Sequence, residues 1–229
     1  MADPRLITAL DLPTTEAADA LVAALGGACA FYKIGLQLLP VGGMELAQDL
    51  KARGNRVFLD FKLHDIPATV EKATRSITGA GADLLTVHAE PPVMRAAVEG
   101  RGGSDLKILA VTVLTAYDDA MLEEMGYRYG ARDLVLRRVE QALAAGVDGV
   151  VASPQEAGEI RSRFGGGFLI VTPGVRPEGA DRGDQKRTAT PAEALKAGAT
   201  HLVIGRPISG AKDPEAAARA IVAEMSGVG

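Results

Sequence analysis

Eight short runs of almost continuously apolar residues limit the fold of this chain more than any other feature of its sequence. They span residues 5–12, 30–36, 56–63, 83–89, 106–114, 147–153, 168–174 and 200–206. Strands that are buried on both faces of a parallel sheet have this composition, whereas strands with one solvated face alternate apolar and polar residues. Each run therefore predicts a strand of a parallel sheet that is covered on both sides.

Segments with helical character lie between the predicted strands. They include 15–25, 42–53, 67–80, 131–145, 154–163 and 191–197. The last of them has clear start signals, because Thr190 is a good N-cap, Pro191 fits the first turn and Glu193 completes a capping box. Strand and helix thus alternate throughout the sequence.

Eight strands that alternate with helices in 229 residues predict a (β/α)8 TIM barrel of the α/β class, with a doubly wound open sheet as the alternative. No linker or composition shift divides the sequence, so we expect residues 1–229 to form a single catalytic domain. Such barrels carry their chemistry where the strands end. Polar and charged residues follow most predicted strands at that point, namely Asp11, Lys33, Asp60, Lys62, His88, Thr115, Ser153, Arg176 and Arg206.

Charge and cysteine content exclude several classes of function. The net charge is −4 and no long Lys/Arg run occurs, which argues against a general binder of nucleic acid or of anionic membranes. Cys29 is the one cysteine, so a disulfide within the chain is impossible and a cysteine-based metal site is disfavoured. No apolar run reaches the ~18 residues of a membrane span, and the N-terminus lacks the features of a signal peptide. We therefore expect a cytoplasmic protein.

The stretch "FLDFKLHDIP" (58–67) places three charges where an apolar strand is predicted. Asp60 and Lys62 are two residues apart and point the same way on a strand, and Asp65 follows in the loop. Lys33 comes from the neighbouring strand, so a row of alternating charges is expected at the barrel mouth. The alternative is an ion-pair network that only holds the barrel together, although apolar residues usually do that as well.

The motifs of several reaction classes are missing from the sequence. It contains no HExxH, no cluster of His and Cys, no GxSxG, no Walker loop and no GxGxxG. What remains is a lysine between carboxylates, which stays protonated because opposite charges favour its charged form. Such a lysine is a proton donor, and the set suits a reaction that forms a carbanion and then protonates it.

A second group of residues predicts an anion site. The polar segment 172–187 follows the seventh predicted strand, and "IGRPISG" follows the eighth, where barrels often bind phosphate. Arg176 and Arg206 offer forked donors, Gly205 offers an uncovered backbone N–H, and Gln185 is placed to close over a ligand. The alternative is a solvated loop with incidental arginines.

At these residues the sequence closely resembles the orotidine 5′-phosphate decarboxylase family, over nearly its whole length. The resemblance is carried by "ALDLP", "YKIGLQL", "LDFKLHDIPATV", "VTVLTA", "TPGVRP…DQKR" and "VIGRP", in this order. It implies conversion of orotidine 5′-phosphate to UMP and carbon dioxide, the last step of UMP synthesis, without a cofactor or a metal.

The resemblance also implies catalytic roles and a homodimer with shared sites. Lys62 would protonate C6 of the pyrimidine, Asp60 and Asp65 would sit beside the departing carboxylate, and Lys33 would support Asp60. In this family the acid at Asp65, with the nearby Thr69, comes from the partner subunit.

For substrate binding, the resemblance implies contacts of Asp11 and Lys33 with the ribose and of Thr115 with the pyrimidine. The phosphate region would be met by Arg176, Gln185, Gly205 and Arg206. One departure follows the fourth strand, where family members often carry glycines and this chain has Glu90, Pro91 and Pro92, which suggests a stiffer loop. The role of His88 at the end of that strand is left open.

Two alternative functions remain. Sugar-phosphate decarboxylases and synthases of the same barrel family resemble this chain in the Asp-x-Lys-x-x-Asp motif, but they use a Mg²⁺-stabilised enediolate. They typically carry glutamate at the position of Lys33, and a second cation there is wrong for holding Mg²⁺. A non-enzymatic phosphate-binding barrel would not need Lys62 between two carboxylates.

Overall fold

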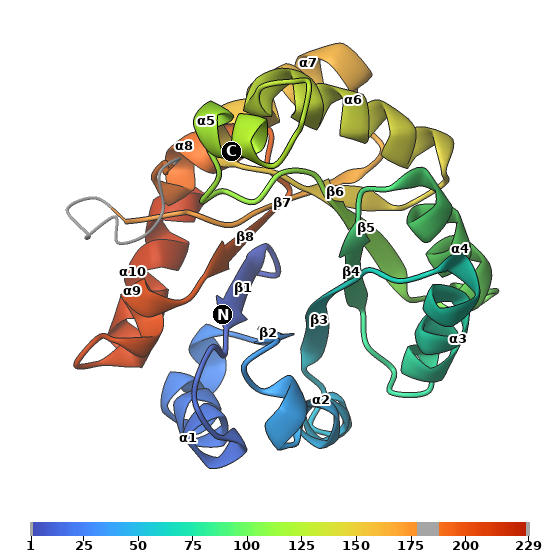
Figure 1. Ribbon diagram of the computed structural model, residues 1–229. Coiled ribbons are helices and arrows are strands. Elements are labelled where there is room, and N and C mark those ends of the chain that lie inside the picture. Colours follow the sequence, from blue (N-terminus) through green and yellow to red (C-terminus); the bar gives the residue numbers. More distant parts are fainter. Residues whose placement is uncertain (1, 178–187, 228–229) are drawn as a thin grey trace.

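The computed structural model describes residues 2–177 and 188–227. Eight parallel strands, which pair in chain order, close into a barrel, and the helices surround them (Figure 1). The predicted (β/α)8 barrel is confirmed and the open-sheet alternative is wrong. The strands are β1 (Leu6–Ala9), β2 (Phe31–Gly35), β3 (Arg56–Leu63), β4 (Leu84–His88), β5 (Lys107–Val111), β6 (Gly149–Val151), β7 (Leu169–Thr172) and β8 (His201–Ile204).

The helices occupy the connections between the strands and the segment after β8. They are α1 (Thr15–Leu25), η1 (Gly26–Ala28), η2 (Leu39–Val41), α2 (Gly43–Ala52), α3 (Pro67–Thr78), α4 (Pro91–Arg101), α5 (Asp119–Glu124), α6 (Ala131–Ala144), α7 (Pro154–Phe164), α8 (Pro191–Lys196), α9 (Arg206–Ser209) and α10 (Pro214–Ser226). Within the described ranges, none of them is both long enough and apolar enough to cross a bilayer. That the whole chain forms one domain stays a prediction.

The start signals of α8 work as predicted. The hydroxyl of Thr190 accepts a hydrogen bond from the backbone N–H of Glu193 at 3.3 Å, and the carboxylate of Glu193 accepts one from the N–H of Thr190 at 2.9 Å. Two otherwise unpaired donors at the helix start are thereby satisfied.

The expectation of a stiff loop at Glu90, Pro91 and Pro92 is wrong. Glu90 is the N-cap of α4, and Pro91 and Pro92 are the first two residues of the helix. Proline fits the first turn of a helix because its missing N–H would have no partner there. The two prolines therefore start a helix directly after β4.

Alternate residues of the strands build two apolar layers. The side chains that fill the inside of the barrel include Ile7, Phe31, Phe58, Leu84, Leu109, Val171 and Val203. The residues between them on the same strands pack outward against the helices. The apolar layer inside the barrel closes its interior, as in other barrels of this kind.

Strand β3 departs from regular geometry next to β4. Phe58 and Leu59 pair regularly with β4, but the next paired residue is Leu63, which lies opposite Val87. Residues 60–62 therefore lie opposite Thr86 alone. Lys62, inside this bulge, has φ 49°, and among the described residues it is the one non-glycine residue with a positive φ. Such left-handed backbone costs about 1–2 kcal/mol.

His201 begins β8 at the end of the barrel that lies away from the charge row. The centre of its ring lies 6.0 Å from the centre of the Phe31 ring, and the two rings are perpendicular. The guanidinium of Arg56 lies 4.1 Å from the centre of the same Phe31 ring. Burial, assisted by the positive charges of Arg56 and Arg5, lowers the pKa of His201 to about 4, against a partial opposing effect of Asp3. The folded protein therefore keeps this imidazole neutral.

The depressed pKa predicts how stability depends on pH. Between pH 6.5 and about 4 the unfolded chain binds a proton at His201 and the folded protein does not, so the free energy of unfolding falls as the pH falls. In the variant His201→Gln, the loss of stability between pH 7 and pH 5 should be about 2 kcal/mol smaller than in the wild type. Urea unfolding at the two pH values measures this difference, and an equal loss in both proteins would contradict it.

Candidate active site

A cavity of about 480 Å³ opens where the strands end. The residues predicted from the sequence that line it are Asp11, Lys33, Asp60, Lys62, Thr115, Arg176, Gly205 and Arg206. Asp65 and Thr69 do not line it, and Gln185 lies outside the described residues. The structure thus brings together side chains from both ends of the chain, because the closed barrel places the ends of β1 and β8 side by side.

The charges in this cavity form a continuous row. The ammonium group of Lys33 lies 2.8 Å from Oδ1 of Asp11 and 3.5 Å from Oδ2 of Asp60. The ammonium group of Lys62 lies 2.9 Å from Oδ1 of Asp60. Asp60 therefore sits between two cations, and within one chain the row runs from Asp11 to Lys62 and does not include Asp65.

Burial distinguishes the members of this row. The side chain of Lys33 is 8% exposed and that of Asp60 is 15% exposed, whereas that of Asp11 is 52% exposed. Burial by itself raises the pKa of Asp60, but Lys33 and Lys62 outweigh it and hold this pKa below its usual value. Asp60 is therefore ionised, which gives both ammonium groups a permanent counterion.

Thr86 of β4 also contacts this row, and the sequence analysis missed it. Its hydroxyl donates to Oδ1 of Asp60 at 2.9 Å and accepts a hydrogen bond from the backbone N–H of Lys62 at 3.0 Å. Thr86 lies two residues after the inward-facing Leu84, so the alternation of β4 would have placed it inside the barrel. A threonine in an apolar run is common, however. Its hydrogen-bond partners depend on the bulge in β3, which the sequence does not reveal.

Gly35 makes room for the charge row, and it too was missed. A side chain at this last residue of β2 would come within 2.9 Å of both the ammonium group of Lys33 and the carboxylate of Asp11. The absence of a side chain at Gly35 therefore lets two strands bring opposite charges into contact.

The β3–α3 loop turns away from the cavity. Asp65 and Thr69 are exposed, and the carboxylate of Asp65 accepts a hydrogen bond from the N–H of Ile66 at 2.6 Å. The side chain of Ile66 is 67% exposed, and that of Leu36, just past the neighbouring strand β2, is 57% exposed. The structure thus presents an acid and two large apolar side chains outward near the mouth.

Three of the residues predicted to form an anion site line the same cavity. Arg176, Gly205 and Arg206 line it, together with Ser209 from the same turn of α9, which the sequence analysis did not name. The backbone of Arg176 is held by a hydrogen bond from its N–H to the carbonyl of Ala189 at 2.9 Å. Two arginines and a serine therefore line the part of the cavity formed by the residues after β7 and β8, beside the end of β1.

Part of the cavity wall is apolar. Val111, Val113 and Leu114 come from β5 and the residues after it, and Val151 comes from β6. Thr115, which is buried, adds a hydroxyl beside this wall. A flat ring with a few polar atoms suits such a surface better than a fully hydroxylated sugar does.

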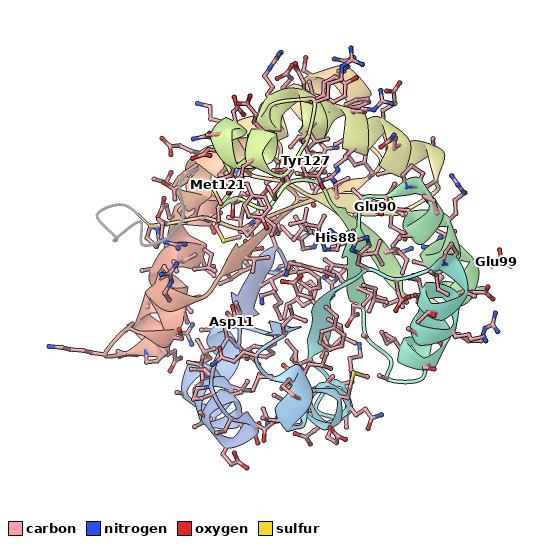
Figure 2. All side chains as sticks on the ribbon, in the orientation of Figure 1. Asp11, His88, Glu90, Glu99, Met121 and Tyr127 are labelled. Atoms are coloured by element: carbon pink, nitrogen blue, oxygen red, sulfur yellow. The ribbon has the colours of Figure 1, made fainter. Side chains whose placement is uncertain are left out.

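Two of the polar residues at the strand ends have other partners. The hydroxyl of Ser153 accepts a hydrogen bond from the N–H of Gln155 at 3.2 Å and so caps α7. The His88 ring lies 4.8 Å from that of His64, and His64 Nε2 lies 3.1 Å from a carboxylate oxygen of Glu90. Burial lowers the pKa of His88, and the electrostatic effect of His64 lowers it further. Figure 2 shows His88 and Glu90 side by side at the end of β4.

Comparisons with known proteins identify the family of this chain. Residues 4–221 match the family described as orotidine 5′-phosphate decarboxylase / HUMPS. The orotidine 5′-phosphate decarboxylase of Caulobacter sp. (strain K31) is 62% identical over 99% of both chains, and that of Caulobacter vibrioides (strain NA1000 / CB15N) is 63% identical over 99% of both. A crystal structure of orotidine 5′-phosphate decarboxylase from Lactobacillus acidophilus matches with a TM-score of 0.85 and 36% identity, covering 97% of this chain and 99% of the other.

The charge row predicts unequal effects of two similar substitutions. Asp60→Asn removes the counterion that the buried Lys33 shares with the partly exposed Lys62, and it should lower the free energy of unfolding by about 2–4 kcal/mol. Asp11→Asn removes an exposed partner of Lys33 and should lower the free energy of unfolding by about 1 kcal/mol or less. Urea unfolding at pH 7 measures both, and equal losses would show that Asp60 is not the shared counterion.

Proposed function

The chain belongs to the orotidine 5′-phosphate decarboxylase / HUMPS family, and we propose that it is a carboxy-lyase that converts orotidine 5′-phosphate to UMP and carbon dioxide. This is the last step of UMP biosynthesis. The observation that carries the proposal is the Lys33–Asp60–Lys62 row, which places a proton donor beside a carboxylate in a cavity that two arginines also line.

In the proposed reaction the bond between C6 of the pyrimidine and its carboxylate breaks. The electron pair stays on C6, carbon dioxide leaves, and the ammonium group of Lys62 transfers a proton to C6 to give UMP. Lys62 then regains a proton from water. The hydrogen bond from the ammonium group of Lys62 to Asp60, at 2.9 Å, would hold the proton donor in place during this step.

Asp60 has a second role in this proposal. Its carboxylate is ionised and would lie beside the substrate carboxylate, so like charges face each other before the reaction and no longer do so once carbon dioxide has formed. Lys33, at 3.5 Å, keeps Asp60 charged and in place. Contacts to the distant phosphate would supply the binding energy that brings the two carboxylates together.

The remaining roles follow the same orientation of substrate. We assign the phosphate to Arg176, Gly205 and Arg206, with Gln185 outside the described residues. Asp11 and Lys33 would bind the ribose hydroxyls, and Thr115 the pyrimidine. The cavity supports this assignment, because the arginines, the charge row and apolar residues of β5 and β6 all line it. No metal or cofactor has a part in the proposed reaction.

The family description also includes sugar-phosphate enzymes, and Lys33 argues against that reading here. Its ammonium group contacts two carboxylates of the cavity, Asp11 and Asp60. A divalent metal at these carboxylates would have to displace a buried cation. A barrel that only binds phosphate would not need the strained backbone of Lys62.

The catalytic unit in this proposal is a homodimer in the cytoplasm. Asp65 and Thr69 are exposed and do not reach the cavity of their own chain, so a role in catalysis requires the cavity of a second chain. The exposed Ile66 and Leu36 would be covered when two mouths meet. Each site would then combine Lys62 of one subunit with Asp65 of the other.

Ultraviolet monitoring of the purified protein with orotidine 5′-phosphate tests the function directly. We expect complete conversion to UMP, undiminished in the presence of EDTA. Strict dependence on added Mg²⁺ would instead favour the sugar-phosphate reaction.

In the same assay Lys62→Ala should lose more than about 10²-fold in rate, because general acid catalysis contributes at least that much. UMP should still bind this variant, since the phosphate contacts lie elsewhere, and a variant with more than a tenth of wild-type activity would refute the role of Lys62.

Mixed dimers test the shared site. Lys62→Ala and Asp65→Ala should each be nearly inactive, and the two proteins are then unfolded and refolded together in equal amounts. About half of the dimers should be mixed, and each mixed dimer has one site with both substitutions and one with neither, so about a quarter of wild-type activity should return. If both residues act within one chain, every site carries one lesion. No recovery in a sample that contains mixed dimers by mass spectrometry would therefore exclude the shared site.

A further inference from the structure

Thr86 is buried beneath the charge row and has no part in the roles assigned above. It is fully buried on β4, and its side chain points into the barrel below the cavity. Its hydroxyl contacts two parts of the site at once, the backbone of Lys62 and the carboxylate of Asp60. A buried hydroxyl with two such partners calls for an explanation beyond the packing of the strand.

The chemistry of a hydroxyl gives these two hydrogen bonds a fixed direction. A threonine hydroxyl has one proton to donate and two lone pairs that accept. An ionised carboxylate only accepts and a backbone N–H only donates, so Thr86 must donate to Asp60 and accept from Lys62. The hydroxyl rotor is therefore locked, and the two groups it joins are held relative to one another.

The bulge in β3 explains why Lys62 needs such a partner. Between the pairs Leu59–Leu85 and Leu63–Val87, the regular ladder of backbone hydrogen bonds is interrupted. Lys62 lies in this gap with φ 49°, a conformation that an ordinary residue leaves unless its surroundings hold it. The hydroxyl of Thr86 accepts a hydrogen bond from the backbone N–H of Lys62 at 3.0 Å, in place of the ladder partner that β4 does not provide.

We propose that Thr86 is a positioning residue, whose hydroxyl holds the left-handed backbone of Lys62 and the carboxylate of Asp60 so that the ammonium group of Lys62 stays aimed at the reacting carbon. This rests on the proposed decarboxylation. Oδ1 of Asp60 accepts from both Thr86 and the ammonium group of Lys62, at 2.9 Å each. The backbone and the tip of the Lys62 side chain are thus tied to the same carboxylate, one of them through Thr86.

Substitutions that separate the hydroxyl from the shape of the side chain test this role. Thr86→Val keeps the shape and removes the hydroxyl, and kcat should fall by roughly 10- to 100-fold, because small misplacements of a reacting group have effects of this size. KM should change by less than about threefold, since the hydroxyl of Thr86 bonds to Lys62 and Asp60 and not to the residues assigned to the phosphate. Thr86→Ser keeps the hydroxyl and should recover kcat to within about threefold of the wild type.

The matched control is Thr8→Val, the same change at another fully buried strand threonine. The hydroxyl of Thr8 points outward and bonds to the sulfur of Cys29 at 3.0 Å, away from the cavity. It should cost stability and leave kcat unchanged. An equal loss of kcat in Thr8→Val and Thr86→Val would mean that Thr86 acts through the stability of the barrel, and the proposal would be overturned.

A second measurement does not depend on activity. In protein labelled with ¹⁵N-lysine, the backbone N–H of Lys62 should exchange slowly with solvent in the wild type and in Thr86→Ser, and much faster in Thr86→Val. If Thr86→Val does not fold, Thr86→Ala takes its place. Fast exchange of the Lys62 N–H in the wild type would by itself refute the hydrogen bond.

The two possible failures can be told apart. An inactive wild type refutes the proposed function. An active wild type refutes the role of Thr86 if Thr86→Val retains its kcat or if Thr86→Ser loses as much as Thr86→Val.

Discussion

The carboxylate of Asp60 is the group on which the site depends. Two ammonium groups, from Lys33 and Lys62, share it in a poorly solvated cavity. Without it Lys33 would be left with the exposed Asp11, and Lys62 would lose its contact with a carboxylate. Charges at such distances interact by several kcal/mol when water is largely excluded. Because the two lysines outnumber the buried carboxylate, the inner part of the row has a positive excess. An anionic substrate can therefore enter, while Asp60 still opposes a carboxylate placed directly beside it.

The barrel makes this arrangement possible because a closed sheet fixes the relative positions of neighbouring strands. Lys33 of β2 pairs with Phe58 of β3, and Gly35 pairs with Asp60, so the lysine reaches across to the acid through the space that Gly35 leaves open. A closed barrel has no edge strand that could slip in register. The apolar layer below the cavity supplies the stability that a row of charges at the mouth does not.

Much of this could be predicted from the sequence because it depends on periodic patterns. Apolar runs mark the strands, and a barrel places whatever follows each run at the mouth, so Lys33, Asp60 and Lys62 were found without a structure. The parts that were missed depend on local geometry. The bulge of β3 and the hydroxyl of Thr86 leave no periodic trace, and Pro91 after a strand fits the start of a helix as well as a stiff loop.

The bulge also shows why the site cannot be built from a regular strand. In an unbroken ladder, β4 would have a residue opposite each of residues 60–62. Instead Thr86 faces all three, and one hydroxyl replaces the missing backbone partner. The strain at Lys62 is therefore tolerated because the same side chain that holds its backbone also binds the carboxylate that holds its ammonium group. Position and charge at Lys62 are thus set by one connected group of atoms.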